Sequence, residues 1–195
     1  MRTILISTAA VLTMGLAACG SSETEETAVD DMAAEPMDEP MQAVAMLMTA
    51  DGESVGTATA MQEGEGVSVT VEGMNMPAGM HGVHIHEVGT CAPDFSASGG
   101  HWNPTDETHG LEEPEGQHAG DMPNLEVGDD GAGTLTYTLE GGATWDGLMD
   151  ADGSAFIVHA GEDDQSTDPA GDSGDRIACG IFESEADAMD EMAAT

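Results

Sequence analysis

Basic side chains are almost absent from this sequence. Of its 195 residues, two are lysine or arginine and 39 are aspartate or glutamate, so the formal net charge is −37 at pH 7. A protein that binds nucleic acid needs a basic surface, because the phosphates must be neutralised. The composition therefore predicts no nucleic-acid partner.

The acidic excess also bears on stability, because like charges in a compact fold repel one another unless salt screens them. At about 1 M salt the Debye length is only about 3 Å. We therefore interpret the composition as adaptation to a high-salt habitat. The alternative is an acidic linker and tails on an ordinary domain. It explains only part of the excess, because acidic residues also crowd the segment 106–175.

The apolar run near the N-terminus is too short to span a membrane. Residues 1–18 carry one cation, Arg2, followed by apolar and small residues, which is the pattern of a secretory signal peptide. The run ends in "LAAC", which resembles the lipobox of bacterial lipoproteins. It predicts cleavage before Cys19 and a lipidated thiol, with several acyl chains as a stable anchor. The alternative is ordinary signal cleavage, with Cys19 an incidental residue.

Cysteine is scarce, and its three copies are an odd number for an exported protein. If Cys19 carries the lipid, Cys91 and Cys179 remain as a pair in an oxidising compartment. A bridge between them closes about 88 residues and would stabilise the fold by about 4–5 kcal/mol in the chain-entropy model.

The chain divides into four parts: the signal peptide 1–18, a tether 19–41, a folded domain 42–183 and an acidic tail 184–195. The tether begins with the lipidated cysteine and continues as an acidic segment without apolar periodicity, which predicts disorder. Its methionines, Met32, Met37 and Met41, can bind Cu(I) through thioether sulfur. Low-complexity drift explains their spacing more simply.

Short stretches with alternating or β-branched residues fill the folded domain: "QAVAMLMTA", "SVGTATAMQ", "GVSVTVEGM", "GTLTYTLEG" and "SAFIVHA". Glycine and aspartate turns separate them, and no stretch resembles a long amphipathic helix. The pattern predicts an all-β fold, an antiparallel sandwich or barrel. Two long segments, 88–123 and 160–175, lack strand pattern. The first contains three histidines, which points to a functional loop.

Histidines gather just before the first of these loops, in "GMHGVHIHEVGTC". On a strand, residues i and i+2 point to the same face. His84 and His86 are therefore predicted to project side by side, with Ile85 facing apolar packing. The pair forms a two-nitrogen metal clamp in this interpretation. The alternative is a polar surface pair.

The following loop supplies His101, His109, His118 and Asp121, and His159 comes at the end of a later strand. Three imidazoles and a carboxylate match a closed tetrahedral zinc site. The glycine, proline and asparagine between them suit a loop that folds back around a metal. Six histidines and one aspartate are seven ligands, one fewer than two four-coordinate sites need. Either one ligand bridges both metals, or one of the two sites has an open position.

The sequence resembles the copper/zinc superoxide dismutases in their bacterial exported form. The matching pieces are "GMHGVHIHEVGTC", "GGHWNP", "HG", "HAGDMPN", "VHAGEDD" and "DPAGDSGDRIACGI", which together cover roughly residues 42–183. The resemblance implies an eight-stranded Greek-key β-barrel or sandwich with two long functional loops. It also implies one copper and one zinc per subunit, and dismutation of superoxide to oxygen and hydrogen peroxide.

The same resemblance assigns the ligands. Zinc and copper would share one residue, His101, as the bridge between them. Copper would be held by His84, His86, His101 and His159, and zinc by His101, His109, His118 and Asp121.

Further residues acquire roles from the resemblance. A disulfide between Cys91 and Cys179 would tie the metal loop to the last strand. Asp163 would link a copper ligand to a zinc ligand and so fix the imidazole orientations. His81 is left over, and we interpret it as a structural histidine bonded to the backbone. Gly82 beside it is expected to allow close backbone approach.

Arg176 would lie beside copper and attract the superoxide anion, and His101 would hold and deliver a proton. After signal cleavage Arg176 is the only basic side chain against 39 acidic ones, a formal charge of −38. A salt bridge with one of those acids is the alternative role. The surrounding "GEDDQSTDPAGDSGDR" departs from the family, whose corresponding loop often carries guiding lysines. Because the protein should repel an anion, we predict that activity rises with salt.

Three functions are compatible with these residues. The favoured one is a membrane-tethered superoxide dismutase that protects the cell envelope from extracytoplasmic superoxide. The others are a metal-buffering copper/zinc lipoprotein and a structural lipoprotein stabilised by its metals. Arg176 and His101 favour the enzyme, because storage needs neither a guiding cation nor a bridge. The expected location is the envelope, anchored and facing the periplasm or exterior, as a monomer or homodimer.

Overall fold

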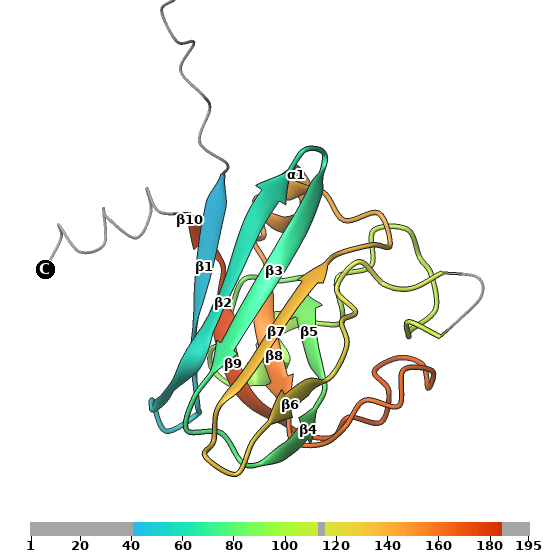
Figure 1. The fold of residues 1–195 in the computed structure, drawn as a ribbon. Coiled ribbons are helices and arrows are strands. Elements are labelled where there is room, and N and C mark those ends of the chain that lie inside the picture. Colours follow the sequence, from blue (N-terminus) through green and yellow to red (C-terminus); the bar gives the residue numbers. More distant parts are fainter. Residues whose placement is uncertain (1–40, 113–115, 185–195) are drawn as a thin grey trace, which may run out of the picture. The chain divides into compact units, whose positions relative to one another are not determined.

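The computed structural model describes residues 41–112 and 116–184 (Figure 1). Four predicted features lie outside the described residues: the signal peptide, the lipidation site Cys19, the tether through residue 40 and the tail from residue 185. No helix in the described ranges is long and apolar enough to cross a membrane.

An eight-stranded antiparallel sheet forms the body of the protein and curls into a half-barrel (Figure 1). Its strand order is β5-β8-β9-β1-β2-β3-β7, and β10 pairs with β1. The expected all-β architecture is confirmed. The strands are β1 (Gln42–Met48), β2 (Ser54–Glu63), β3 (Gly66–Gly73), β5 (Val83–His86), β7 (Gly133–Thr138), β8 (Ala155–His159), β9 (Arg176–Ile181) and β10 (Glu183–Ser184).

Three smaller elements complete the described chain. A two-stranded sheet joins β4 (Gly79–His81) to β6 (Leu125–Val127). A short helix α1 (Trp145–Leu148) follows β7, and a 3₁₀ helix η1 (Phe95–Ser98) lies in the loop after β5.

The alternation seen in the sequence produces the core. Alanine and valine side chains of β2 and β3 point inward and are fully buried, among them Ala58, Ala60 and Val69. Threonines occupy the outer face, where the hydroxyls of Thr70 and Thr136 lie 3.1 Å apart. Strand β8 is instead buried along its whole length. One of its faces packs in the core, and the other is covered by the loop that contains η1.

Five strands match the stretches singled out in the sequence, namely β1, β2, β3, β7 and β8. The short strands β4 and β6 and the last long strand β9 were not singled out. Strands β4 and β6 have three residues each, too few for an alternating pattern to show. Strand β9, "RIACGI", contains glycine and has consecutive buried residues, so it does not alternate either.

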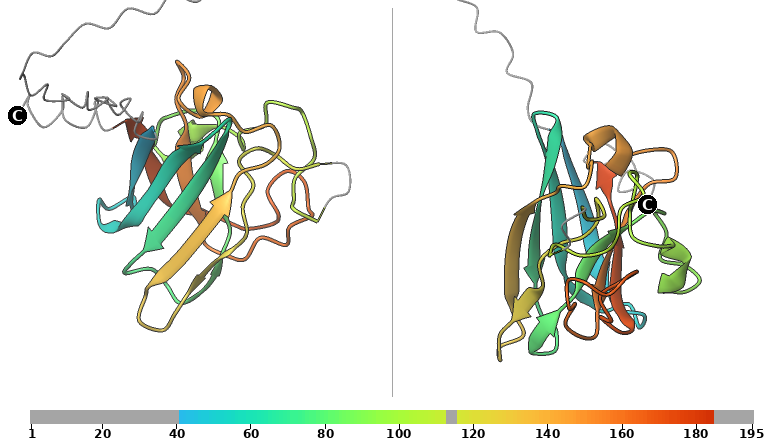
Figure 2. Two further views of the ribbon diagram at one scale, coloured as in Figure 1. Left: turned by 45° about the horizontal axis from the view of Figure 1, so that its top comes forward. Right: turned by 90° about the vertical axis from the view of Figure 1, so that its right-hand side faces the viewer.

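Two long loops leave the sheet on the same side, residues 87–124 and residues 160–175 (Figures 1 and 2). They agree closely with the predicted segments 88–123 and 160–175. They also touch each other: the backbone N–H of His109 donates to Asp168 Oδ1 at 3.1 Å, and that of Glu112 donates to Gln165 O at 3.4 Å. All the histidines singled out as candidate ligands lie on these loops or on the strands that lead into them.

Candidate metal centre

The centre is built on the free edge of β5, the first strand of the sheet order. The long loop returns to this edge and pairs with it. Ile85 N donates to Gly120 O at 2.9 Å, and Trp102 N donates to Ile85 O at 2.9 Å. Gly120 is required here, because a Cβ at this position would clash with the carbonyl oxygen of Ile85. The pairing brings the neighbours of Trp102 and Gly120, His101 and Asp121, against the strand.

A first group of four imidazoles converges at this place. Their ring nitrogens lie within 4.8 Å of one another, and every one of these residues is buried. The predicted side-by-side projection from β5 is found for His84 and His86, because both contribute to the group. The four residues are His84, His86, His101 and His159.

Each of these rings turns one nitrogen outward to a hydrogen-bond acceptor. His84 Nε2 donates to Asp163 Oδ2 at 2.6 Å, and His101 Nδ1 donates to Asp121 Oδ1 at 2.8 Å. The Nδ1 atoms of the other two donate to backbone carbonyls, each at 3.0 Å: His86 to Gly99 and His159 to Gly174.

The inner nitrogens have no partner among the described residues. Unpaired buried polar atoms are rare and costly, so a cluster of four requires an explanation. Because each ring donates through its outer nitrogen, each inner nitrogen presents a lone pair. Four convergent lone pairs are a donor set for a transition metal such as copper. The atoms are His84 Nδ1, His86 Nε2, His101 Nε2 and His159 Nε2.

The protonation state suits this role. Burial lowers the pKa of His84 to about 3, that of His86 to about 2 and that of His159 to about 4. Burial also lowers the pKa of His101. The rings are therefore neutral at pH 7, and protons do not compete with a metal for their lone pairs.

A second group surrounds Asp121. Its Oδ1 accepts from the Nδ1 atoms of His101 at 2.8 Å, His109 at 3.0 Å and His118 at 3.2 Å. Its Oδ2 accepts from the backbone N–H groups of Gly110 at 2.9 Å and His118 at 3.0 Å. Although burial opposes ionisation, these imidazole donors hold the pKa of Asp121 well below its usual range. With a metal ion in place of the imidazole protons, three Nδ1 atoms and one carboxylate oxygen would form the donor set of a closed zinc site.

By distance alone, a second set of possible ligands consists of His84, His101, His109 and Asp121, so His84 takes the place of His118. The hydrogen bonds favour His118. His84 directs Nε2 to Asp163 and leaves Nδ1 in the first group, whereas His118 contacts Asp121 and His101 through Nδ1.

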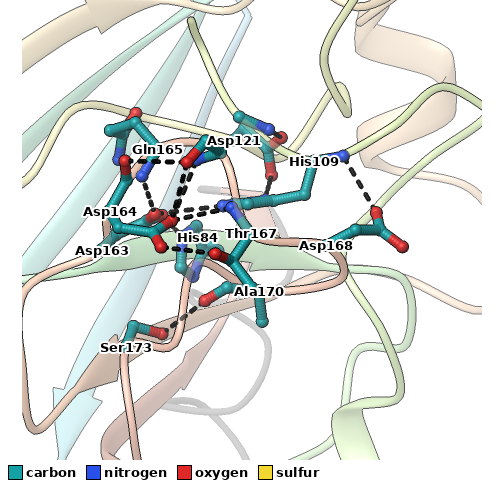
Figure 3. Close-up of polar contacts among 12 residues, drawn as sticks. His84, His109, Asp121, Asp163, Asp164, Gln165, Thr167, Asp168, Ala170 and Ser173 are labelled. Atoms are coloured by element: carbon teal, nitrogen blue, oxygen red, sulfur yellow. Dashed lines mark hydrogen bonds and ion pairs between the residues drawn. The ribbon is translucent and has the colours of Figure 1, made fainter. Parts of the chain in front are cut away.

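Two residues join the groups. His101 faces the first group with Nε2 and the second with Nδ1. Asp163 accepts from His84 Nε2 at 2.6 Å and from His109 Nε2 at 3.1 Å, as Figure 3 shows. Against the effect of burial, bonds to Asp121 and Asp163 raise the pKa of His109 to about 9.

Asp163 is itself held by two residues that the sequence did not single out. Its backbone exchanges two hydrogen bonds of 2.8 Å with the side-chain amide of Asn124. Its Oδ1 also accepts from Gln165 N at 2.6 Å. The Asn124 contacts join residues of two different loops, and no spacing in the sequence signals them, whereas the Gln165 contact is local to the second loop.

Arg176 begins β9 opposite His159, and its guanidinium reaches across to the η1 loop. Nη1 donates to Phe95 O at 2.6 Å, and Nη2 donates to Gly99 O at 2.7 Å. Gly99 O is also the acceptor for His86 Nδ1. Every ion pair within the described ranges involves histidine, so the alternative of a salt bridge for Arg176 is wrong there.

His81 lies outside both groups. Its Nδ1 contacts His159 O at 2.7 Å and its Nε2 contacts Pro77 O at 2.9 Å, so the predicted bonding to backbone is found. Gly82 follows, where the backbone passes closely enough for a Cβ to lie 2.8 Å from the Cβ of Ser173. The glycine lets the chain leave β4 and enter β5 beneath the second loop.

Cys91 and Cys179 form a disulfide with a Cα–Cα distance of 5.9 Å. The bond joins the η1 loop to β9 and packs, together with Phe95, against Ala155 and Ile157 of β8. It therefore fixes the segment that contacts Arg176.

A four-imidazole group and a group of three imidazoles and a carboxylate, sharing one histidine on a curled antiparallel sheet, define a binuclear metalloprotein with sites that fit copper and zinc. Residues 54–182 match the family described as copper/zinc superoxide dismutase (SODC), and the chain belongs to that family.

Relatives support the assignment. The chain is 42% identical to "Superoxide dismutase [Cu-Zn] 1" of Aquifex aeolicus over 67% of this chain and 80% of that protein. Among solved structures, it resembles a SOD-like protein from Bacillus subtilis, with 39% identity, a TM-score of 0.63 and coverage of 71% and 96%. It also resembles the Cu/Zn superoxide dismutase from Brucella abortus, with 28% identity, a TM-score of 0.61 and coverage of 73% and 99%.

Proposed function

We propose that the chain catalyses the dismutation of superoxide at the cell envelope. The observation that carries the proposal is the convergence of four unpaired, buried imidazole nitrogens near the only arginine or lysine within the described residues. The nitrogens fit a copper ion, and the cation fits an anionic substrate.

The metals would be bound as the donor sets indicate. Copper supplies one-electron redox chemistry, which zinc cannot. His101 belongs to both sites and would keep them at a fixed separation. Copper would be held by His84, His86, His101 and His159, and zinc by His101, His109, His118 and Asp121.

Dismutation converts two superoxide anions and two protons into oxygen and hydrogen peroxide. Arg176 would attract each anion, because it is held at β9 without a carboxylate partner among the described residues. His101 would hold and deliver a proton at Nε2, while Nδ1 would stay with the second group as a zinc ligand. Asp163 would keep the rings of His84 and His109 oriented through its two oxygens.

A non-catalytic metal-buffering protein is the second candidate. The Bacillus subtilis relative is named a superoxide dismutase-like protein, so likeness alone does not distinguish a catalyst from a metal-binding protein. The anchored guanidinium favours the enzyme, because metal storage gains nothing from a cation that repels metal ions.

The test is superoxide decay with the full chain loaded with copper and zinc. We expect fast decay, and a rate constant about tenfold lower for Arg176→Ala, with Arg176→Lys in between because it keeps the charge. Unchanged superoxide levels in the presence of both bound metals would leave the buffering protein as the better explanation.

The same assay tests the charge argument. Removal of the signal peptide leaves one basic side chain against 39 acidic ones, and such a protein repels superoxide at long range. We expect the rate constant to rise about two- to fivefold between low and sub-molar salt, as screening shortens the Debye length. A rate that declines steadily with added salt would contradict this prediction.

We further propose that the protein is an exported lipoprotein, anchored through Cys19 and facing the periplasm or exterior, with residues 19–41 as its tether. The support is the signal pattern of residues 1–18. Metabolic labelling with a fatty acid should mark the chain and its membrane fraction, and Cys19→Ser should lose both. A label that persists in Cys19→Ser would exclude this anchor.

A further inference from the structure

Ser98 ends η1 and is fully buried beside Arg176. Its Oγ lies 2.9 Å from Phe95 O and 2.9 Å from Arg176 Nη1. Since a carbonyl oxygen only accepts and a guanidinium nitrogen only donates, the direction of both bonds is fixed. The hydroxyl donates to Phe95 O and accepts from Nη1.

The guanidinium is thus held at both ends by one short segment, residues 95–99. Nη1 donates to Phe95 O and Ser98 Oγ, and Nη2 donates to Gly99 O. Of these three acceptors, Ser98 Oγ is the only side-chain atom. Because the guanidinium is planar and rigid, contacts at both ends also fix the direction of its remaining N–H groups.

Three of the five N–H donors are used in these contacts. The Nε–H and one Nη2–H have no acceptor among the described residues, so they are free to meet an anion. The third acceptor, Gly99 O, also takes the Nδ1–H of His86, a member of the first imidazole group. The shared acceptor Gly99 O therefore links the orientation of the free N–H groups to the position of His86.

We propose that Ser98 is a positioning residue that aims Arg176 at the anion which enters the first imidazole group. The inference rests on the proposed function. Without the hydroxyl, one Nη1–H loses its acceptor. The guanidinium can then turn toward Asp94 at the other end of η1, whose negative charge attracts it. No other arginine or lysine within the described ranges can replace it.

The test compares Ser98→Ala with a matched control, Ser173→Ala. Ser173 is equally buried, and its hydroxyl also donates to the carbonyl three residues earlier, Ala170 O at 2.9 Å (Figure 3). The side-chain hydrogen bonds of Arg176 within the described residues go to the η1 segment and not to Ser173. Azide, a small anion that binds Cu(II), is titrated into the copper- and zinc-loaded full chain by visible absorption. We expect azide affinity about fivefold weaker in Ser98→Ala and unchanged in Ser173→Ala.

Superoxide decay is measured on the same proteins. The rate constant should fall about three- to fivefold in Ser98→Ala, and Ser98→Thr, which keeps the hydroxyl, should recover it. When Arg176 is already replaced by alanine, Ser98→Ala should not lower the rate constant further, because Ser98 acts only through the guanidinium. An equal loss in that background would show a general structural role and overturn the proposal.

The two readouts separate this inference from the proposed function. If Ser98→Ala weakens azide binding but the wild-type protein does not consume superoxide, the positioning role is supported and the dismutase function is contradicted. If the wild-type protein is active and Ser98→Ala changes neither azide affinity nor rate constant, only the positioning role is contradicted.

Discussion

His101→Ala is expected to abolish superoxide turnover and to weaken both metal sites at once. The residue presents Nε2 to the first group and Nδ1 to the second, so its loss removes one donor from each. It also removes the proposed proton carrier, and positioned proton transfer is worth about 10²–10⁴-fold in rate. We therefore expect at least about a 10²-fold lower rate constant, measured by superoxide decay alongside the copper and zinc content after dialysis.

Two matched variants show whether the effect belongs to the shared position. His86→Ala removes a donor of the first group alone, and His118→Ala removes a donor of the second group alone. The first should lose copper and keep zinc, and the second the reverse. If His101→Ala loses only one metal, it is not the shared ligand.

Loss of the disulfide is expected to destabilise the protein by about 4–5 kcal/mol, because the bond closes a loop of 88 residues. Cys91→Ser combined with Cys179→Ser should shift the denaturant midpoint of the metal-free protein accordingly. The wild-type protein with reductant should reach the same midpoint. A midpoint that does not move would show that the loop is held by its apolar contacts with Ala155 and Ile157 alone.

Activity should fall with stability in this variant. The disulfide fixes the segment that supplies all three acceptors for Arg176. A looser segment leaves the cation less well directed, so the rate constant of the folded, metal-loaded variant should also drop.

Local pattern was sufficient for much of the fold. Strands β1, β2, β3 and β7 are recognisable by alternation, because their inner and outer faces meet different surroundings, whereas β8, buried on both faces, is recognisable only as a short apolar run. The pair His84 and His86 could be placed on one face for the same reason. The positions of both loops followed from the absence of such a pattern.

Long-range contacts could not be predicted in the same way. The docking of Gly120 and Trp102 on the edge of β5 depends on loop closure, and no periodicity encodes it. Ser98 and Arg176 are 78 positions apart in the chain, and Asn124 and Asp163 are 39 apart. The ligand assignment came from the family resemblance, because counting donors left an open site equally acceptable.

The edge of β5 has one more consequence. A free strand edge is a template on which another chain can pair, and proteins avoid aggregation by covering such edges. Here the covering segment is the loop that carries His101 and Asp121, whose neighbours Trp102 and Gly120 occupy the backbone groups of Ile85. The loop that carries these proposed metal ligands therefore also keeps this strand from joining the strands of other molecules.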